Sequence, residues 1–140
     1  MTAEERLAEA LETPSIAVVP FLLDAGSDVN SNLVETISQG IADRMNEDGF
    51  RVAYGEAVEK FRNKQGVTAA EVAEVLGVRY VLIGTVGGAG EELRISAVLH
   101  DVVLGMSVFR GSFYGDRVSV ASLHDQVVTS LLAVLDNIRG

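Results

Sequence analysis

The seven residues from Gly84 to Gly90 read GTVGGAG and follow an apolar stretch, an arrangement that can either cradle a phosphate or form a tight turn. A dinucleotide-binding G-x-G-x-x-G sequence opens a helix whose N-terminus faces the phosphates. Here Glu91 and Glu92 come next and lead into another strand-like stretch. Two carboxylates would repel a phosphate, and no lysine follows in the order of a P-loop. The glycines therefore predict a hairpin turn.

The two histidines, His100 and His124, are each followed by an aspartate. A hydrolytic triad also needs a nucleophile within hydrogen-bonding reach of a base. Serines are plentiful, but none lies in a G-x-S-x-G sequence. We interpret both histidines as surface residues and predict that the chain is not an enzyme.

The loop from Asp24 to Asn32 is the one place where the sequence hints at a metal site. Asp28, Asn30 and Asn32 alternate as in a calcium loop, but the sixth position would be Leu33 and the twelfth Gln39. The chain has no cysteine, which excludes disulfides and thiolate ligands. We expect no metal or cofactor. We expect instead that Asn32 caps the next helix, with Glu35 at the capping-box position.

The charge and composition of the chain limit the kinds of partner that it can bind. The net charge of −9 and the scattered lysines and arginines argue against nucleic-acid binding. No uninterrupted apolar run approaches the roughly 18 residues needed to cross a bilayer, so no membrane span is expected in this chain. The first residues, MTAEERLAEALETP, lack the basic and apolar regions of a secretory signal. The compartment, periplasmic or cytoplasmic, stays open.

The pattern of apolar residues predicts one domain over 15–140, preceded by a short helix or linker over 1–14 that ends at Pro14. Within the domain we expect strands at 15–21, 50–54, 79–86, 93–99 and 106–114, and helices at 33–48, 69–76 and 119–138. The order is β-α-β-α-β-β-β-α. Helical connections make the first three strands parallel, and short turns make the last three an antiparallel meander. The fold class is therefore α/β, a mixed five-stranded sheet packed by helices.

TAAE at 68–71 is a capping box for the second helix, and Gly77 is expected to end it with a positive φ. In the strand at 93–99 the apolar residues alternate, and in the strand at 106–114 Val108 is expected on the opposite face from Phe109. The apolar stripe of the last helix comprises Val120, Leu123, Val127, Leu131, Val134 and Ile138.

Two apolar stretches lie where polar residues are expected. Val102, Val103 and Leu104 fall between Asp101 and Gly105, at a predicted hairpin turn, and Leu22 and Leu23 follow Pro20 at a strand exit. Both stretches can fold back onto the core. Alternatively, they form a contact surface for another chain, because grouped exposed apolar residues tend to mark interfaces.

Four segments together resemble the TolB N-terminal-like domain family: SIAVVPF, VAEVLGVRYVLIGTV, LRISAVLHDVVLG and the closing helix after LHDQV. The resemblance runs from Ser15 to about Ile138, and its strongest part is Val75 to Leu82. It implies an anticodon-binding-like fold, no catalytic residues and action by protein–protein contact. Modules of this family occur in bacterial proteins beside cyclase domains, winged-helix regulators or tetratricopeptide repeats.

The function expected from these features is a non-catalytic interaction or accessory domain of a bacterial envelope or signalling protein. Its partner is an unidentified protein or a second copy of the chain, with the contact at Leu22, Leu23, Val102, Val103 and Leu104. The alternative is a small-molecule sensor with its site at the carboxyl ends of the parallel strands. That rim comprises Phe21 to Asp24, Ala53 to Glu56 and Thr85 to Gly88.

Overall fold

The computed structural model describes residues 15–24, 26–61 and 66–139, so the helix or linker predicted over 1–14 lies outside the described residues. The elements follow one another as β1 (Ser15–Val18), β2 (Leu22–Leu23), α2 (Ser31–Glu47), β3 (Arg51–Ala53), the 3-10 segment η1 (Gly55–Phe61), α3 (Ala69–Leu76), β4 (Tyr80–Gly87), β5 (Glu92–Asp101), β6 (Met106–Asp116), the 3-10 turn η2 (Arg117–Ser119) and α4 (Val120–Arg139).

The strands form one mixed sheet in the order β3-β1-β4-β5-β6, and β2 also pairs with β4. Strands β3, β1 and β4 are parallel, whereas β4, β5 and β6 are antiparallel. The predicted α/β class and the division into a parallel and an antiparallel half are confirmed. β4 belongs to both halves and holds them together.

The sheet has a sixth strand that the sequence pattern did not predict, because β2 is only two residues long. Val18 pairs with Leu82 and Leu22 pairs with Thr85, so β1–β2 uses one more residue than β4 over the same span. The extra residue falls around Pro20, which cannot donate to the ladder. β1 and β2 are thus one strand interrupted by a bulge.

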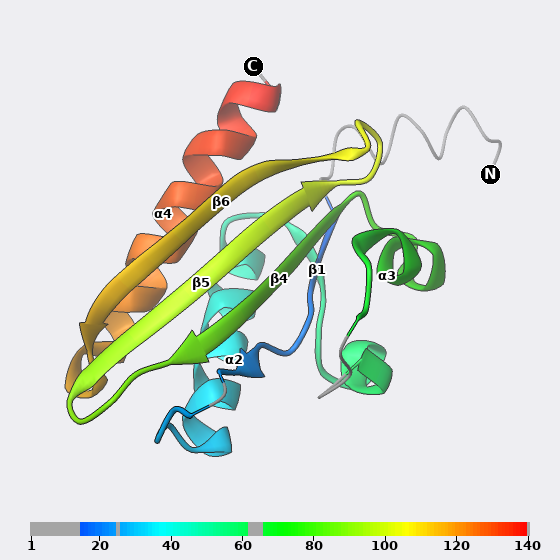
Figure 1. Cartoon of the computed structure of the whole chain (residues 1–140). Helices are drawn as coiled ribbons and strands as arrows, with labels where there is room; N and C mark the ends of the chain where they lie inside the picture. Colours follow the sequence, from blue (N-terminus) through cyan, green and yellow to red (C-terminus); the bar gives the residue numbers. More distant parts are fainter. Residues whose placement is uncertain (1–14, 25, 62–65, 140) are drawn as a thin grey trace, which may run out of the picture.

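Helices cover the two faces of the sheet unequally (Figure 1). On one face, α2 and α4 pack on a continuous core that includes Ile16, Leu82, Ile95 and Leu99. On the other face, η1 and α3 pack against β1 and the beginning of β4, around Ala17 and Val81. Over β5 and β6, this second face is left open, as the front of Figure 1 shows.

Local signals set the ends of the helices. The Thr68 side chain accepts a hydrogen bond from Glu71 N–H at 3.2 Å, and Gly77 ends α3 with a φ of 67°, both as predicted. The predicted cap of α2 was wrong by two residues. Asn30, not Asn32, accepts from Leu33 N–H at 2.8 Å. The helix starts earlier because Val29 is buried and anchors the chain there.

The last helix also differs from the expected pattern. Leu123, Val127 and Leu131 of the expected stripe are buried, but Leu135 is buried in place of the half-buried Val134, and Val128 is buried as well. By length and composition, Arg117–Asp136 is long and apolar enough to cross a membrane. This property was not predicted, because polar residues interrupt the apolar runs of the segment. In this structure one face of the segment packs on the sheet through Leu123, Val127 and Leu131, and 28% of the segment is buried.

The antiparallel half has an irregularity between Leu99 and His100. β5 alternates as predicted, with Leu93, Ile95, Ala97 and Leu99 buried. On β6, Val108 was expected on the opposite face from Phe109, yet both pack against the same core. The bulge explains the difference, since an extra residue re-aims a side chain.

Candidate functional site

Three of the apolar residues singled out in the sequence lie at the tip of the β5–β6 hairpin. Val102, Val103, Leu104 and Gly105 connect the two strands. Val102 is half-buried and packs against the core beneath α3, as the first interpretation expected. Val103 and Leu104 are 70% and 53% exposed, and Met106, the first residue of β6, is 58% exposed. The tip therefore presents three large apolar side chains to solvent.

Asp101 fixes the shape of this tip. Its side chain is fully buried, and Oδ1 accepts hydrogen bonds from the backbone N–H groups of Val103 and Leu104 at 3.0 and 3.2 Å. The same carboxylate pairs with Arg79, whose Nη2 lies 2.9 Å from Oδ2. This bond to Asp101 raises the pKa of Arg79. The exposed side chains thus project from a turn that a buried ion pair holds in place.

This role of Asp101 was not predicted from the sequence, where Asp101 was considered only as the neighbour of His100. Arg79 was likewise read only as the start of a strand. A signal was present, because an aspartate before a turn commonly binds the turn's backbone N–H groups, and Gly105 closes the turn with a φ of 70°.

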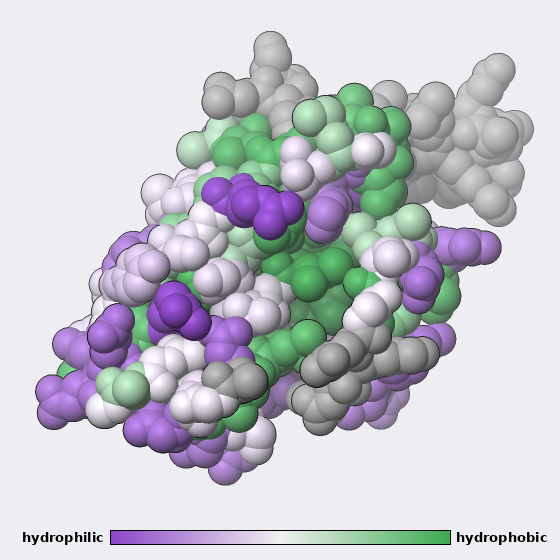
Figure 2. Space-filling model, viewed as in Figure 1, coloured by the Kyte–Doolittle hydropathy of each residue, from purple (hydrophilic) through white to green (hydrophobic). Residues whose placement is uncertain are grey.

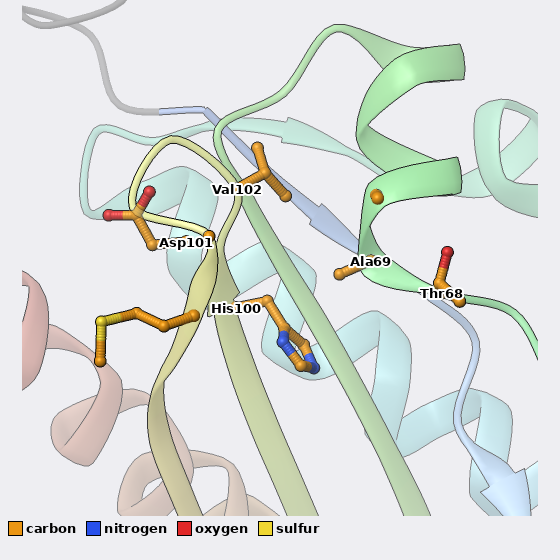
Figure 3. A pocket seen from close by; sticks show the side chains of 8 residues that line it. Thr68, Ala69, His100, Asp101 and Val102 are labelled. Atoms are coloured by element: carbon orange, nitrogen blue, oxygen red, sulfur yellow. The ribbon is translucent and has the colours of Figure 1, made fainter.

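A cavity of about 300 Å³ lies between the hairpin and the start of α3. We call it the hairpin groove; its lining is Thr68, Ala69, Ala70, His100, Asp101, Val102, Gly105 and Met106. Figure 3 shows His100 and Val102 pointing toward Thr68 and Ala69, whereas the Asp101 carboxyl group points away from them. In Figure 2, apolar residues gather at the centre of this face, between the hairpin and α3.

The hairpin groove offers apolar contact and one imidazole. Burial and, to a smaller extent, the charge of Arg110 lower the pKa of His100 below its ordinary value of 6.5, which favours the neutral ring. The Thr68 hydroxyl already caps α3, and the Asp101 carboxylate is bound to Arg79. Among the lining residues, no nucleophile is paired with His100. The groove is suited to binding an apolar group.

Leu22 and Leu23 lie at the opposite end of β4 from the hairpin. They pair with Thr85 and Val86 near its end, whereas Val102 N–H bonds to the Arg79 carbonyl just before its start. At about 3.3 Å per residue, the two groups are roughly 20 Å apart. Leu22 is half-buried and Leu23 is 44% exposed. The structure therefore does not bring the two predicted contact groups together.

The rim considered for a small-molecule site is filled in part by the protein's own groups, while Tyr54 and Gly55 border a cavity of about 250 Å³. Phe21 is buried, and its N–H donates to the Ser38 hydroxyl at 3.1 Å. Asp24 forms an ion pair with Arg94, and Asp28 forms one with Arg117. The bond to Arg117 lowers the pKa of Asp28. These pairs tie the acidic loop to the β4–β5 turn and to η2.

The glycine cluster forms the hairpin turn that was predicted. Gly88 and Gly90 have φ values of 152° and 64°, and Glu92 N–H donates to the Ala89 carbonyl at 3.2 Å. Gly90 N–H points to the Asp28 carboxylate at 3.3 Å, which further excludes an anion there. Within the described parts of the chain, no three histidine, aspartate or glutamate side chains meet as metal ligands would.

The interpretation of His124 as a surface residue was wrong. It is half-buried between α2 and α4, and its ring lies against Gly40, where a Cβ atom would overlap it. Burial, followed by the charge of Arg44, lowers its pKa. The small residue at position 40 leaves room for the ring, so His124 is a packing residue.

The sequence matches no protein-family model and no curated protein. Solved structures share the fold. TolB from Acinetobacter baumannii matches with a TM-score of 0.64 at 17% identity, over 88% of this chain and 28% of the TolB chain. Lipoprotein GNA1162 from Neisseria meningitidis gives 0.57 at 23%, over 88% and 96%. The PelC dodecamer from Paraburkholderia phytofirmans gives 0.54 at 20%, over 88% and 87%.

At these identities the matches show a common fold. This chain has the mixed α/β fold that TolB, GNA1162 and PelC share. It spans little more than a quarter of the TolB chain but nearly the full length of the GNA1162 chain.

Proposed function

We propose that this domain is a non-catalytic protein-interaction module of a bacterial envelope or signalling protein. Its contact surface consists of Val103, Leu104 and Met106 at the hairpin tip together with the adjoining hairpin groove. The observation that supports this most directly is the exposure of Val103 and Leu104 on a turn held by a buried ion pair.

The arrangement favours binding because the turn is ordered before a partner arrives. Two backbone hydrogen bonds to Asp101 fix the directions of Val103 and Leu104. A preorganised surface loses less conformational entropy on association than a flexible one. Burying each apolar side chain contributes about 1.5–3 kcal/mol before such losses. The tip and groove together can therefore anchor one apolar segment of a partner.

The fold matches agree with such a role. PelC is described as a dodecamer and GNA1162 as a lipoprotein, which supports an assembling, envelope-associated domain. Leu23 offers a separate, smaller contact on the far end of the sheet. The alternative of a ligand site at the carboxyl ends of the parallel strands has less support, because Phe21 is buried and the Asp24 carboxylate is already paired with Arg94.

The test replaces Leu104 with a photoreactive amino acid in the source bacterium and identifies the protein that becomes cross-linked. Binding of that purified partner is then measured for the Val103→Ser/Leu104→Ser variant and for Val75→Ser, a matched control on α3 that is 51% exposed. We expect at least a tenfold loss of affinity for the hairpin variant only, with unchanged melting temperatures for both. Equal affinity of the two variants, or equal cross-linking from position 75, would contradict the proposed surface.

A further inference from the structure

The outer edge of β6 is a further surface, and it lies outside the proposed contact site. β6 is eleven residues long, ends the sheet, and within the described residues pairs only with β5. Edge strands of soluble proteins are usually short or protected by lysine or proline. Between Met106 and Tyr114, Arg110 is the one charged residue, and there is no proline.

Exposed apolar side chains are concentrated along the same strand and its flanks. Besides the hairpin tip, Tyr114 is 60% exposed and Val118, just after β6, is 93% exposed. Phe109 and Phe113 are half-buried at the border of the core, with their ring centroids 6.1 Å apart. This edge therefore has both free backbone groups and apolar surface to cover.

The hydrogen-bonding pattern shows which backbone groups face outward. Arg117 N–H donates to the Glu91 carbonyl at 3.1 Å, so residue 117 is turned toward β5. Glu92 N–H bonds to Ala89 instead of to Asp116, its partner in the register. In an antiparallel ladder the two kinds of pair alternate. Residues 110, 112, 114 and 116 consequently direct their N–H and C=O groups away from β5.

We propose that this edge pairs antiparallel with the same edge of a second copy of the chain, about a two-fold axis at Phe113. Only outward-facing residues can exchange hydrogen bonds, so even-numbered residues must lie opposite even-numbered residues. With the axis at Phe113, Ser112 lies opposite Tyr114 of the second copy and Arg110 opposite its Asp116. The Asp116 carbonyl is used by η2, so the outward residues form roughly six backbone hydrogen bonds between the copies.

Side-chain chemistry selects this register among those of the same parity. Moving the axis along the strand places Arg110 opposite Ser112, Tyr114 or another Arg110, and only the axis at Phe113 gives Arg110 a carboxylate. The pair occurs twice by symmetry. On the helix-covered face, the two Phe113 rings become close cross-strand neighbours, which is favourable for aromatic pairs.

The overall charge of −9 on each chain opposes this association at long range. Screening by salt reduces that repulsion, while the two local Arg110–Asp116 pairs decide the register. This surface is separate from the hairpin groove, and either can fail without the other.

The experiment is sedimentation equilibrium of the purified chain and its charge variants. In the Arg110→Asp variant, the introduced carboxylate faces Asp116 of the other copy; in the Asp116→Arg variant, two guanidinium groups meet. We expect each variant alone to dimerise at least tenfold more weakly than the wild type. An equal mixture of the two should associate as strongly as the wild type, because each mixed pair is then attractive.

A backbone variant provides the second arm. Ser112→Pro removes one outward N–H and spares the ladder to β5, so it should lose the dimer, while Ser112→Ala should keep it. The proposal is wrong if the wild type is monomeric at millimolar concentration or if the charge variants associate unchanged. It is also wrong if Val103→Ser/Leu104→Ser alone abolishes association, since the hairpin would then be the contact.

Discussion

Asp101 is a single side chain on which the candidate contact surface depends. It is fully buried, it neutralises Arg79, and it holds two N–H groups of the hairpin tip. A buried ion pair contributes little to the free energy of unfolding relative to a pair of apolar residues at the same two positions. Removing one partner, however, leaves the other charge buried and unpaired.

We therefore expect Asp101→Ala to lower the free energy of unfolding by about 3 kcal/mol. The matched control is Glu74→Ala, an exposed carboxylate on α3 outside both proposed contact surfaces, which should change it by less than about 0.5 kcal/mol. Urea denaturation at pH 7 measures both. If Asp101→Ala were as stable as Glu74→Ala, Asp101 would not anchor the turn.

At the scale of elements, the β4–β5 turn depends on two glycines for different reasons. Gly90 has a φ of 64° and open space around it, so an added Cβ strains only the backbone. Gly88 has a φ of 152°, and a Cβ there would also overlap the carbonyl oxygen of Glu92. Backbone atoms of the partner strand cannot move aside as a flexible side chain can.

Gly90→Ala should consequently lower the free energy of unfolding by about 1 kcal/mol. Gly88→Ala should lower it by about 3 kcal/mol, since strain and overlap act together. Thermal melting of the two variants in parallel distinguishes the causes, because the glycines occupy the same turn. Equal losses would mean that the overlap is relieved by a shift of the turn.

Elements with local signals could be predicted from the sequence, whereas those fixed by distant contacts could not. Thr68 caps the start of α3 and Gly77 ends it, each through a hydrogen bond to a residue of α3, and both positions were predicted. Asn30 and Asn32 are equally good caps in isolation, and the burial of Val29 chooses between them. β2 was not predicted, because a strand of two residues is too short to show a periodic pattern of apolar residues.

The candidate site was predicted in part for the same reason. The sequence located apolar residues in the turn, yet it could not separate Val102, which packs inward, from Val103, which does not. That direction is set by Asp101, whose partner Arg79 is 22 residues away. The position of α3 beside the hairpin, which creates the hairpin groove, depends on the whole sheet.

At the scale of the whole molecule, the two histidines give stability a pH dependence. Burial is the largest cause that lowers the pKa of both His100 and His124 below the ordinary value of 6.5. Between the lowered and the ordinary pKa, the unfolded chain binds more protons than the folded chain, so stability rises with pH. Asp28, with its pKa lowered from 3.8, stays ionised in both states above pH 5 and contributes no slope there.

We expect the free energy of unfolding to fall as the pH is lowered from 7.5 to 5.5. The His100→Gln/His124→Gln variant should show a smaller fall, because glutamine does not titrate. The difference cannot exceed about 1.4 kcal/mol per pH unit for each histidine. Urea titrations of both proteins at the two pH values measure it, and parallel slopes would show that the histidines are not the cause.

The position of β4 in both halves of the sheet also bears on the order in which the strands come together during folding. β4, β5, β6 and α4 are consecutive in the chain and are joined by short turns, so their contacts close small loops. The pairing of β1 with β4 joins Ile16 to Tyr80 and closes a loop of more than sixty residues. Closing such a long loop costs chain entropy before the contacts between β1 and β4 can compensate for it. We therefore expect the antiparallel half to fold first, and β1, together with its partner β3, to be added afterwards to the β4 strand that this half contains.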